Sequence, residues 1–122
     1  MNAIKIDAEN RVIKYVQIGS DYKEIYELLG LECSCFTAPY IFRNDDTIYV
    51  DDEGLLSSMS LPGWVFFGED GTVWKFVGNG LILGGDGNGD NAPVKSSLGD
   101  IGARVDFMTP DEVQQYKEEL GY

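Results

Sequence analysis

The feature that most constrains the fold is a hairpin pattern in the middle of the chain. The segments "WVFF" and "VWKFV" are rich in aromatic and β-branched residues, and "GEDGT" separates them. Asp70-Gly71 in that separator is a strong signal for a hairpin turn. On two paired strands, Trp64 and Phe66 share one face, and Trp74 and Phe76 share one face. The pattern therefore predicts antiparallel strands whose aromatic residues make core or cross-strand contacts.

Five further segments have the composition of strands. "AIKI" and "VIKYVQI" predict a second hairpin, with Ile4 and Ile6 on one face. "CSCFTAPYIF" predicts a strand that ends at Pro39, because proline cannot donate to a strand ladder. "TIYV" and "GNGLILGG" predict two more short strands.

Helix signals occur in three places. In "SDYKEIYELLG", Ser20 or Asp21 caps the start and Gly30 closes the end. In "TPDEVQQYKEELGY", Thr109 is the cap, proline follows it in the first turn, and Gly121 comes after the last turn. "SSLGDIGARVDFM" predicts a short helix that runs into a short strand.

The length and apolar content fit one small domain. A chain of 122 residues can bury a hydrophobic core. No stretch reaches the ~18 apolar residues of a membrane span, and the start lacks the basic-then-apolar pattern of a signal peptide. We therefore expect a cytoplasmic, single α+β domain over residues 1–122, with a mainly antiparallel sheet and two or three helices.

The charge balance narrows the class of partner. Nine Lys and Arg face twenty-one Asp and Glu, for a net charge of −12. Such a chain repels nucleic-acid backbones and anionic membranes, so neither is expected as a direct partner. It can instead meet a protein with a basic surface. The alternative is that the charge only maintains solubility. The oligomeric state is left open by the sequence.

Histidine is absent, which removes the commonest general base and metal ligand. No catalytic site is apparent, so we do not expect an enzyme, a cofactor or a resident metal. The two cysteines, Cys33 and Cys35, lie in "ECSC", and zinc would need two further ligands that are not evident. We interpret them as a reduced, partly buried pair on one strand face.

The glycine-rich loop "GGDGNGDNAP" has the residue types of a calcium site. Asp86, Asn88 and Asp90 match the first three ligand positions of a calcium loop. The sixth position holds Asn91 instead of glycine, and the twelfth holds Ser97 instead of glutamate. Because glycine, aspartate and asparagine also form turns without any ligand, we predict an exposed, mobile connection that binds no metal.

A nucleotide-binding motif fits the same loop less well. Gly87, Gly89 and Ala92 match a loose G-x-G-x-x-A pattern, and Asp106 lies near the distance expected for a ribose contact. That motif requires a helix directly after the glycines, whereas Pro93 follows here.

Two other groups are candidate interaction residues. Acidic side chains cluster around one short strand and in the "GED" turn, and we expect them on a solvated or partner-facing surface. Of the aromatic residues, Trp64 or Trp74 becomes an interface anchor if it is exposed. The predicted partner-binding residues are Asp45, Asp46, Asp51, Asp52, Glu53, Glu69 and Asp70.

The order of segments resembles an uncharacterised family of small proteins encoded by phages, plasmids and other mobile elements. The resemblance covers "AIKIDAENRVIKYVQI", "YKEIYELLGLE", "IYVDDEGLL", "VGNGLILGG" and "SSLGDIGARVDFMTPDEV", and its specific parts are "YVDDEGLL" and "GNGLILGG". The resemblance implies a mobile-element context and supplies no catalytic residues. Proteins of this kind often act against host defence by binding a host component.

These observations lead to two functional hypotheses. The first is a stoichiometric inhibitor that covers the basic surface of a host nucleic-acid-handling defence complex, of the anti-CRISPR or antirestriction type. The second is a protein that sequesters a small signalling nucleotide, with stacking from Trp64 or Trp74 and backbone N–H groups of residues 78–89. Only Lys75, Lys95 and Arg104 lie near that region to meet phosphates.

Overall fold

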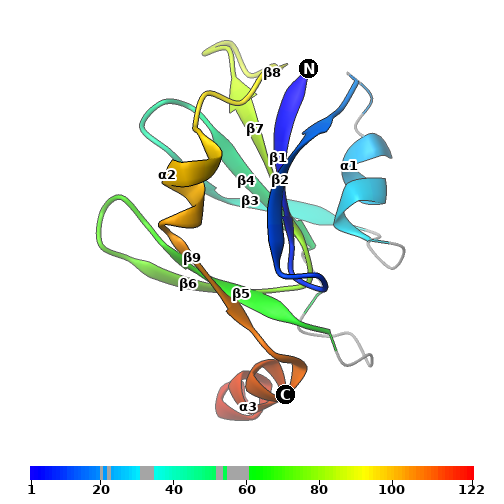
Figure 1. Cartoon of the computed structure of the whole chain (residues 1–122), viewed down its shortest axis with the longest axis vertical. Helices are drawn as coiled ribbons and strands as arrows, with labels where there is room; N and C mark the ends of the chain where they lie inside the picture. Colours follow the sequence, from blue (N-terminus) through cyan, green and yellow to red (C-terminus); the bar gives the residue numbers. More distant parts are fainter. Residues whose placement is uncertain (20, 22, 31–34, 52–53, 55–60) are drawn as a thin grey trace.

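The computed structural model describes residues 1–19, 21, 23–30, 35–51, 54 and 61–122. Within these residues the chain forms a small α+β domain of nine strands and three helices (Figure 1). The strands are β1 Asn2–Asp7, β2 Val12–Gln17, β3 Phe36–Ile41, β4 Thr47–Asp51, β5 Gly63–Phe67, β6 Val73–Val77, β7 Gly80–Gly85, β8 Asn91–Ala92 and β9 Val105–Met108, and the helices are α1 Lys23–Leu29, α2 Leu98–Gly102 and α3 Pro110–Leu120.

The strands form two antiparallel sheets. In the larger sheet the order is β2-β1-β7-β4-β3, and β8 pairs with the end of β7. The smaller sheet has the order β6-β5-β9. The α+β class with a mainly antiparallel sheet is therefore confirmed. None of the described helices is long and apolar enough to cross a membrane.

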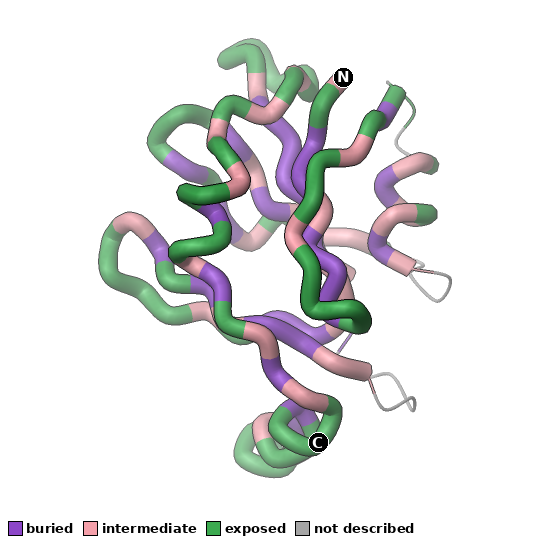
Figure 2. The backbone as a smooth tube through the Cα atoms, in the orientation of Figure 1, coloured by how far each residue is buried: buried purple, intermediate pink, exposed green. Residues whose placement is uncertain are grey.

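The layers follow from the alternation of side chains along each strand. The main core lies between the two sheets, where Ile6 and Ile82 of the larger sheet face Trp64 and Phe66 of the smaller one, and Ile101 of α2 joins them. A second cluster lies between α1 and the outer face of the larger sheet, and a third lies between α3 and the outer face of the smaller sheet. Figure 2 shows these buried residues along the sheet interiors.

One glycine sets how closely the two sheets approach. A Cβ atom built on Gly80 of β7 would lie 2.3 Å from the Cζ2 atom of Trp64 in β5. No real side chain tolerates that distance, so the indole ring occupies the space that a larger residue would need. Both residues are fully buried or nearly so.

The local signals near the chain ends and in the hairpins are confirmed. The "AIKI" and "VIKYVQI" segments pair as β1 and β2, and Ile4 and Ile6 are both fully buried. The "GEDGT" segment joins β5 to β6. Thr109 caps α3 through a reciprocal box with Glu112, and Gly121 ends the helix with φ 87°.

The first helix and the helix-to-strand segment also form as predicted. The Asp21 carboxylate accepts a hydrogen bond from the Lys23 amide at the start of α1, at 3.0 Å, and Gly30 follows its last residue. Ser20, the other candidate cap, lies outside the described residues. Ser97 caps α2, and the chain then enters β9.

Two local predictions are wrong. Pro39 does not end its strand, because β3 continues to Ile41. The strand lies at the edge of the larger sheet and its register shifts between Thr37 and Tyr40, so the missing N–H of proline costs no ladder bond. Cys35 is exposed and lies before the strand, which contradicts a partly buried pair, and Cys33 lies outside the described residues.

Candidate functional site

Two of the predicted acidic turns lie next to each other. They are the turn between β3 and β4, at residues 42–46, and the turn between β5 and β6, at residues 68–72. The Glu69 carboxylate accepts a hydrogen bond from the Arg43 amide at 2.9 Å. The Glu69 amide donates to the hydroxyl of Tyr40 at 2.7 Å. The first bond links the two turns and the second links the β5–β6 turn to β3, although 26 and 29 residues of sequence separate the bonded pairs.

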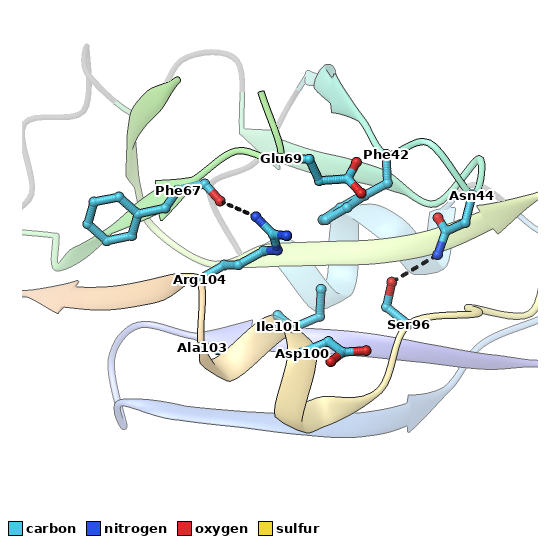
Figure 3. Close-up of a pocket in the computed structure, with 9 residues that line it drawn as sticks. All are labelled: Phe42, Asn44, Phe67, Glu69, Ser96, Asp100, Ile101, Ala103 and Arg104. Carbon is cyan, nitrogen blue, oxygen red and sulfur yellow. Dashed lines mark hydrogen bonds between the residues drawn. The ribbon is translucent and has the colours of Figure 1, made fainter. Parts of the chain in front are cut away.

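A cleft opens between these two turns and α2. Its volume is about 580 Å³. The floor is apolar, since Phe42 is 5% exposed and Ile101 is fully buried. Figure 3 shows the lining side chains, which come from three separate parts of the chain. They are Phe42, Asn44, Phe67, Glu69, Ser96, Asp100, Ile101, Ala103 and Arg104.

Three charged side chains line the cleft. Glu69 and Asp100 carry carboxylates, and Arg104 carries a guanidinium. The Arg104 Nη1 atom donates to the carbonyl oxygen of Phe67 at 3.1 Å, which holds the guanidinium beside the end of β5 (Figure 3). The three groups leave the cleft wall with one net negative charge.

Four exposed or half-exposed acids surround this part of the molecule, and we call them the acidic end: Asp45, Glu69, Asp70 and Asp100. They come from the β3–β4 turn, the β5–β6 turn and α2, which lie together at the left of Figure 1. Hydrogen bonds from the side chain and backbone of Thr72 hold the pKa of Asp70 below its ordinary value. Asp70 therefore stays ionised to a lower pH than an ordinary aspartate does.

Asp46, predicted to face a partner, is instead fully buried. Its carboxylate accepts hydrogen bonds from the amides of Lys95 and Ser96 at 3.0 Å and 2.8 Å. It also accepts one from the Ser96 hydroxyl at 2.6 Å and one from the Asn44 side-chain amide at 3.3 Å. The residue is a structural clamp between the β3–β4 turn and the segment before α2, which corrects its assignment to an interaction surface.

The remaining predicted acids lie elsewhere. Asp51 is at the opposite end of β4 from the turn that holds Asp45, and the strand from Thr47 to Asp51 spans about 13 Å. Asp52 and Glu53 lie outside the described residues. The structure therefore divides the predicted acidic cluster and joins only its first part to Glu69 and Asp70.

The two tryptophans differ in their surroundings. Trp64 is fully buried between the sheets, which contradicts a role as an exposed anchor or stacking platform. Trp74 is half-buried, and its Nε1 atom donates to the Thr72 hydroxyl at 2.8 Å. Its ring stacks on Phe76, with centroids 6.1 Å apart and planes at 14°. The alternation of residues along the sequence predicts which side chains share a face of these strands, but it does not predict which face is exposed to solvent.

The three cations considered for phosphate binding do not converge. Arg104 lines the cleft. The Lys75 ammonium lies over the ring of Tyr116 in α3, 5.0 Å from the centroid. The Lys95 ammonium donates to the carbonyl oxygen of Gly85 at 2.8 Å. Of these three cations, only Arg104 is placed to contact a phosphate bound in the cleft.

The glycine-rich loop forms the turn of the β7–β8 hairpin. Residues 86–91 are exposed, as predicted, while Asn91 and Ala92 pair with β7. The Asp86 carboxylate accepts hydrogen bonds from the amides of Asn88 and Asp90 at 2.7 Å and 3.2 Å. Its oxygen thus closes the turn of the loop itself. Among the residues with assigned structure, no group of three or more acids or cysteines is arranged to hold a metal ion.

Several lining residues were not identified from the sequence. Asn44 and Ser96 lie in a turn and a bend, Asp100 lies in the first turn of α2, and no local spacing relates them. The only signal was indirect, since Ser97 marks the start of a helix and so places Asp100 in its first turn. Contacts between residues 44–46 and 95–96 span fifty positions and have no local pattern.

Comparison with known proteins places the chain in one family. No curated protein and no solved structure matches it. The family model described as "Domain of unknown function (DUF3846)" matches residues 1–120, nearly the whole length. The chain therefore belongs to the DUF3846 family of uncharacterised proteins.

Proposed function

We propose that this chain is a non-enzymatic binding protein encoded by a phage or another mobile element. It acts in the host cytoplasm as a stoichiometric inhibitor of a nucleic-acid-handling defence complex, of the CRISPR or restriction type. It does so by covering a basic surface that otherwise contacts DNA or RNA. The resemblance to mobile-element proteins and the net charge of −12 support this proposal.

The observation that carries the proposal is the acidic end. Its four carboxylates come from three separate elements that the fold brings to one side of the molecule. The hydrogen bonds between the β3–β4 and β5–β6 turns, and the Asp46 clamp behind them, fix those elements relative to one another. Arg43, exposed in the same β3–β4 turn, and Arg104 in the cleft offset two of these four charges. The remaining negative charge steers a basic partner and selects its orientation.

Removal of the four charges tests this surface. The variant carries Asp45→Asn, Glu69→Gln, Asp70→Asn and Asp100→Asn. Each amide keeps an oxygen that can still accept the hydrogen bonds of Glu69 and Asp70. Tagged protein is used to capture partners from a nuclease-treated host lysate, and mass spectrometry identifies them. We expect nucleic-acid-binding proteins with the unaltered chain and their loss with the variant.

A matched variant controls for net charge. It removes four exposed acids that lie outside the acidic end, on β9 and α3, and leaves the Glu112 capping box intact: Asp106→Asn, Asp111→Asn, Glu118→Gln and Glu119→Gln. We expect this control variant to capture the same nucleic-acid-binding proteins as the unaltered chain. Equal loss in both variants, or no nucleic-acid-binding protein at low or physiological salt, contradicts the proposal.

A second candidate, sequestration of a small signalling nucleotide, retains one favourable observation. The Arg104 guanidinium lines a cleft that has an apolar floor. Glu69 and Asp100 oppose a phosphate there, and Trp64 is not accessible for stacking. A thermal-shift panel of cyclic and linear nucleotides decides the matter, since a bound ligand raises Tm. A shift that Arg104→Gln abolishes favours this candidate, and a flat panel removes it.

A further inference from the structure

The free edge of the larger sheet has a regular hydrogen-bonding pattern. Met1 and Ile18 exchange two backbone hydrogen bonds, at 2.8 Å and 3.0 Å. In an antiparallel pair, such hydrogen-bonded positions alternate with non-bonded ones. The register of β1 with β2 therefore directs the backbone of residues 12, 14 and 16 toward β1. The N–H and C=O groups of Ile13, Tyr15 and Gln17 point away from the sheet.

These outward groups have no backbone partner in the part of the chain that the structure describes. None of the six residues of β2 is buried, as Figure 2 shows, and Val12 and Tyr15 are 43% and 47% exposed. Proteins commonly protect an edge strand with proline, a bulge or charge. The other edge of this sheet, β3, has both Pro39 and a register shift. The β2 edge has neither of these two; its one charged side chain is Lys14, and α2 contacts the strand.

The β1–β2 hairpin also carries positive charge in a strongly acidic protein. Lys5 and Lys14 lie directly opposite each other across the two strands. Arg11 is exposed in the connecting turn. Their positive potential acts on Asp7, because both lysines contribute to lowering its pKa. An acidic group on a neighbouring strand would meet these two lysines on one face of the sheet.

We propose that β2 binds an extended segment of a partner protein as an added antiparallel strand, with a carboxylate side chain opposite Lys14. The backbone groups of Ile13, Tyr15 and Gln17 supply the hydrogen bonds, and Lys14 selects the side chain. A second copy of this chain is a poorer occupant. Two antiparallel β2 strands related by a twofold axis place both Lys14 side chains on the same face, close together, where like charges repel.

Hydrogen exchange with a designed peptide tests the proposal. The probe is a blocked hexapeptide of alternating threonine and valine with one central glutamate, added to the full chain. We expect slower exchange at the amides of Ile13, Tyr15 and Gln17. The amides of Lys14 and Val16 already face β1 and serve as internal references. A peptide with lysine in place of glutamate should bind about two- to fivefold more weakly, as expected for a cross-strand charge pair.

The variant Lys14→Glu reverses the charge on the protein, so that the preference between the two peptides should also reverse. It is an exposed substitution opposite Lys5, so it introduces an attractive pair within the hairpin and preserves the fold. We expect it to prefer the lysine peptide. The proposal is overturned if neither peptide, at millimolar concentration, changes the exchange of these amides. It is also overturned if the same amides become protected without peptide as the protein concentration rises, because a second copy of the chain is then the occupant. The acidic end lies on other elements, so either proposal can fail without the other.

Discussion

The hydroxyl of Ser96 donates a 2.6 Å hydrogen bond to the buried carboxylate of Asp46, fifty residues earlier in the chain. The same carboxylate accepts hydrogen bonds from the backbone amides of residues 95 and 96. This contact attaches the segment before α2 to the β3–β4 turn. It thereby sets the width of the cleft at the acidic end, because both parts line it.

The substitution Asp46→Asn tests the clamp. Asparagine has nearly the same size as aspartate, but its NH₂ group replaces one of the two carboxylate oxygens. That NH₂ group then faces an N–H or O–H donor and cannot accept its hydrogen bond. We expect the free energy of unfolding to fall by about 1–3 kcal/mol. The exposed neighbour Asp45→Asn should change it by less than about 0.5 kcal/mol. Urea denaturation measures both, and an equal, small effect of the two substitutions contradicts the clamp.

A double-mutant cycle tests the close approach of the two sheets. Gly80→Ala places a Cβ atom within 2.3 Å of the Trp64 ring and should lower the free energy of unfolding by about 1–3 kcal/mol. In a Trp64→Phe background the ring is smaller, so the cost of Gly80→Ala should be reduced. An unchanged cost in the two backgrounds would show that the ring is not the obstacle.

Gly99→Ala provides the matched glycine control for that cycle. Gly99 lies in α2, is exposed, and has no atom closer than 3.9 Å to the position of an added Cβ. Alanine also favours helix relative to glycine. We therefore expect a gain of up to about 1 kcal/mol in the free energy of unfolding, measured in the same urea series.

The buried carboxylate of Asp7 predicts a pH dependence. Burial raises its pKa, but hydrogen bonds from the Asn10 side chain and backbone, together with the charges of Lys5 and Lys14, outweigh burial and lower it below the ordinary value of 3.8. A pKa that is lower in the folded state stabilises the fold above the unfolded pKa. That contribution is lost as the pH falls through the folded pKa.

The corresponding variant is Asp7→Asn. Its stability deficit relative to the unaltered chain should be full near neutral pH and should shrink below about pH 4. Thermal unfolding between neutral and strongly acidic pH measures the difference. A deficit that is constant or grows on acidification contradicts this assignment.

The glycine-rich loop is expected to remain unaffected by calcium. Asp86 already binds the amides of Asn88 and Asp90, and Ser97, at the position where a calcium loop needs glutamate, accepts the Asp100 amide as the cap of α2. A calcium titration followed by NMR should leave the loop signals in place. Saturable shifts confined to Asp86, Asn88 and Asp90 at micromolar calcium would restore the metal site.

Features encoded within a few residues could be predicted from the sequence. The Asp70-Gly71 turn and the Thr109 cap each depend on neighbours in the chain, so their chemistry is visible without a fold. The place of Pro39 inside a strand could not be predicted, because the edge position and register shift that tolerate proline depend on the pairing of β3 with β4.

The site depends on contacts that no local pattern contains. Asp45 and Asp46 are adjacent in one acidic run, yet one is exposed and the other fully buried, because only the second reaches Ser96. Trp64 and Trp74 likewise both face the core between the two sheets, but Trp64 lies on the central strand β5 and Trp74 on the edge strand β6, so only Trp64 is fully buried. The cleft itself forms only where the β3–β4 turn, the β5–β6 turn and α2 meet.

The most direct test of the central claim is a displacement titration. A fluorescent nucleic-acid duplex is bound to the host protein captured by this chain, and its anisotropy is followed as the chain is added. Coverage of the nucleic-acid-binding surface predicts stoichiometric release of the duplex by the unaltered chain and by the β9 and α3 control variant. The acidic-end variant should release little. The account is contradicted if the duplex stays bound when this chain is in excess. It is also contradicted if the acidic-end variant displaces the duplex as well as the unaltered chain does.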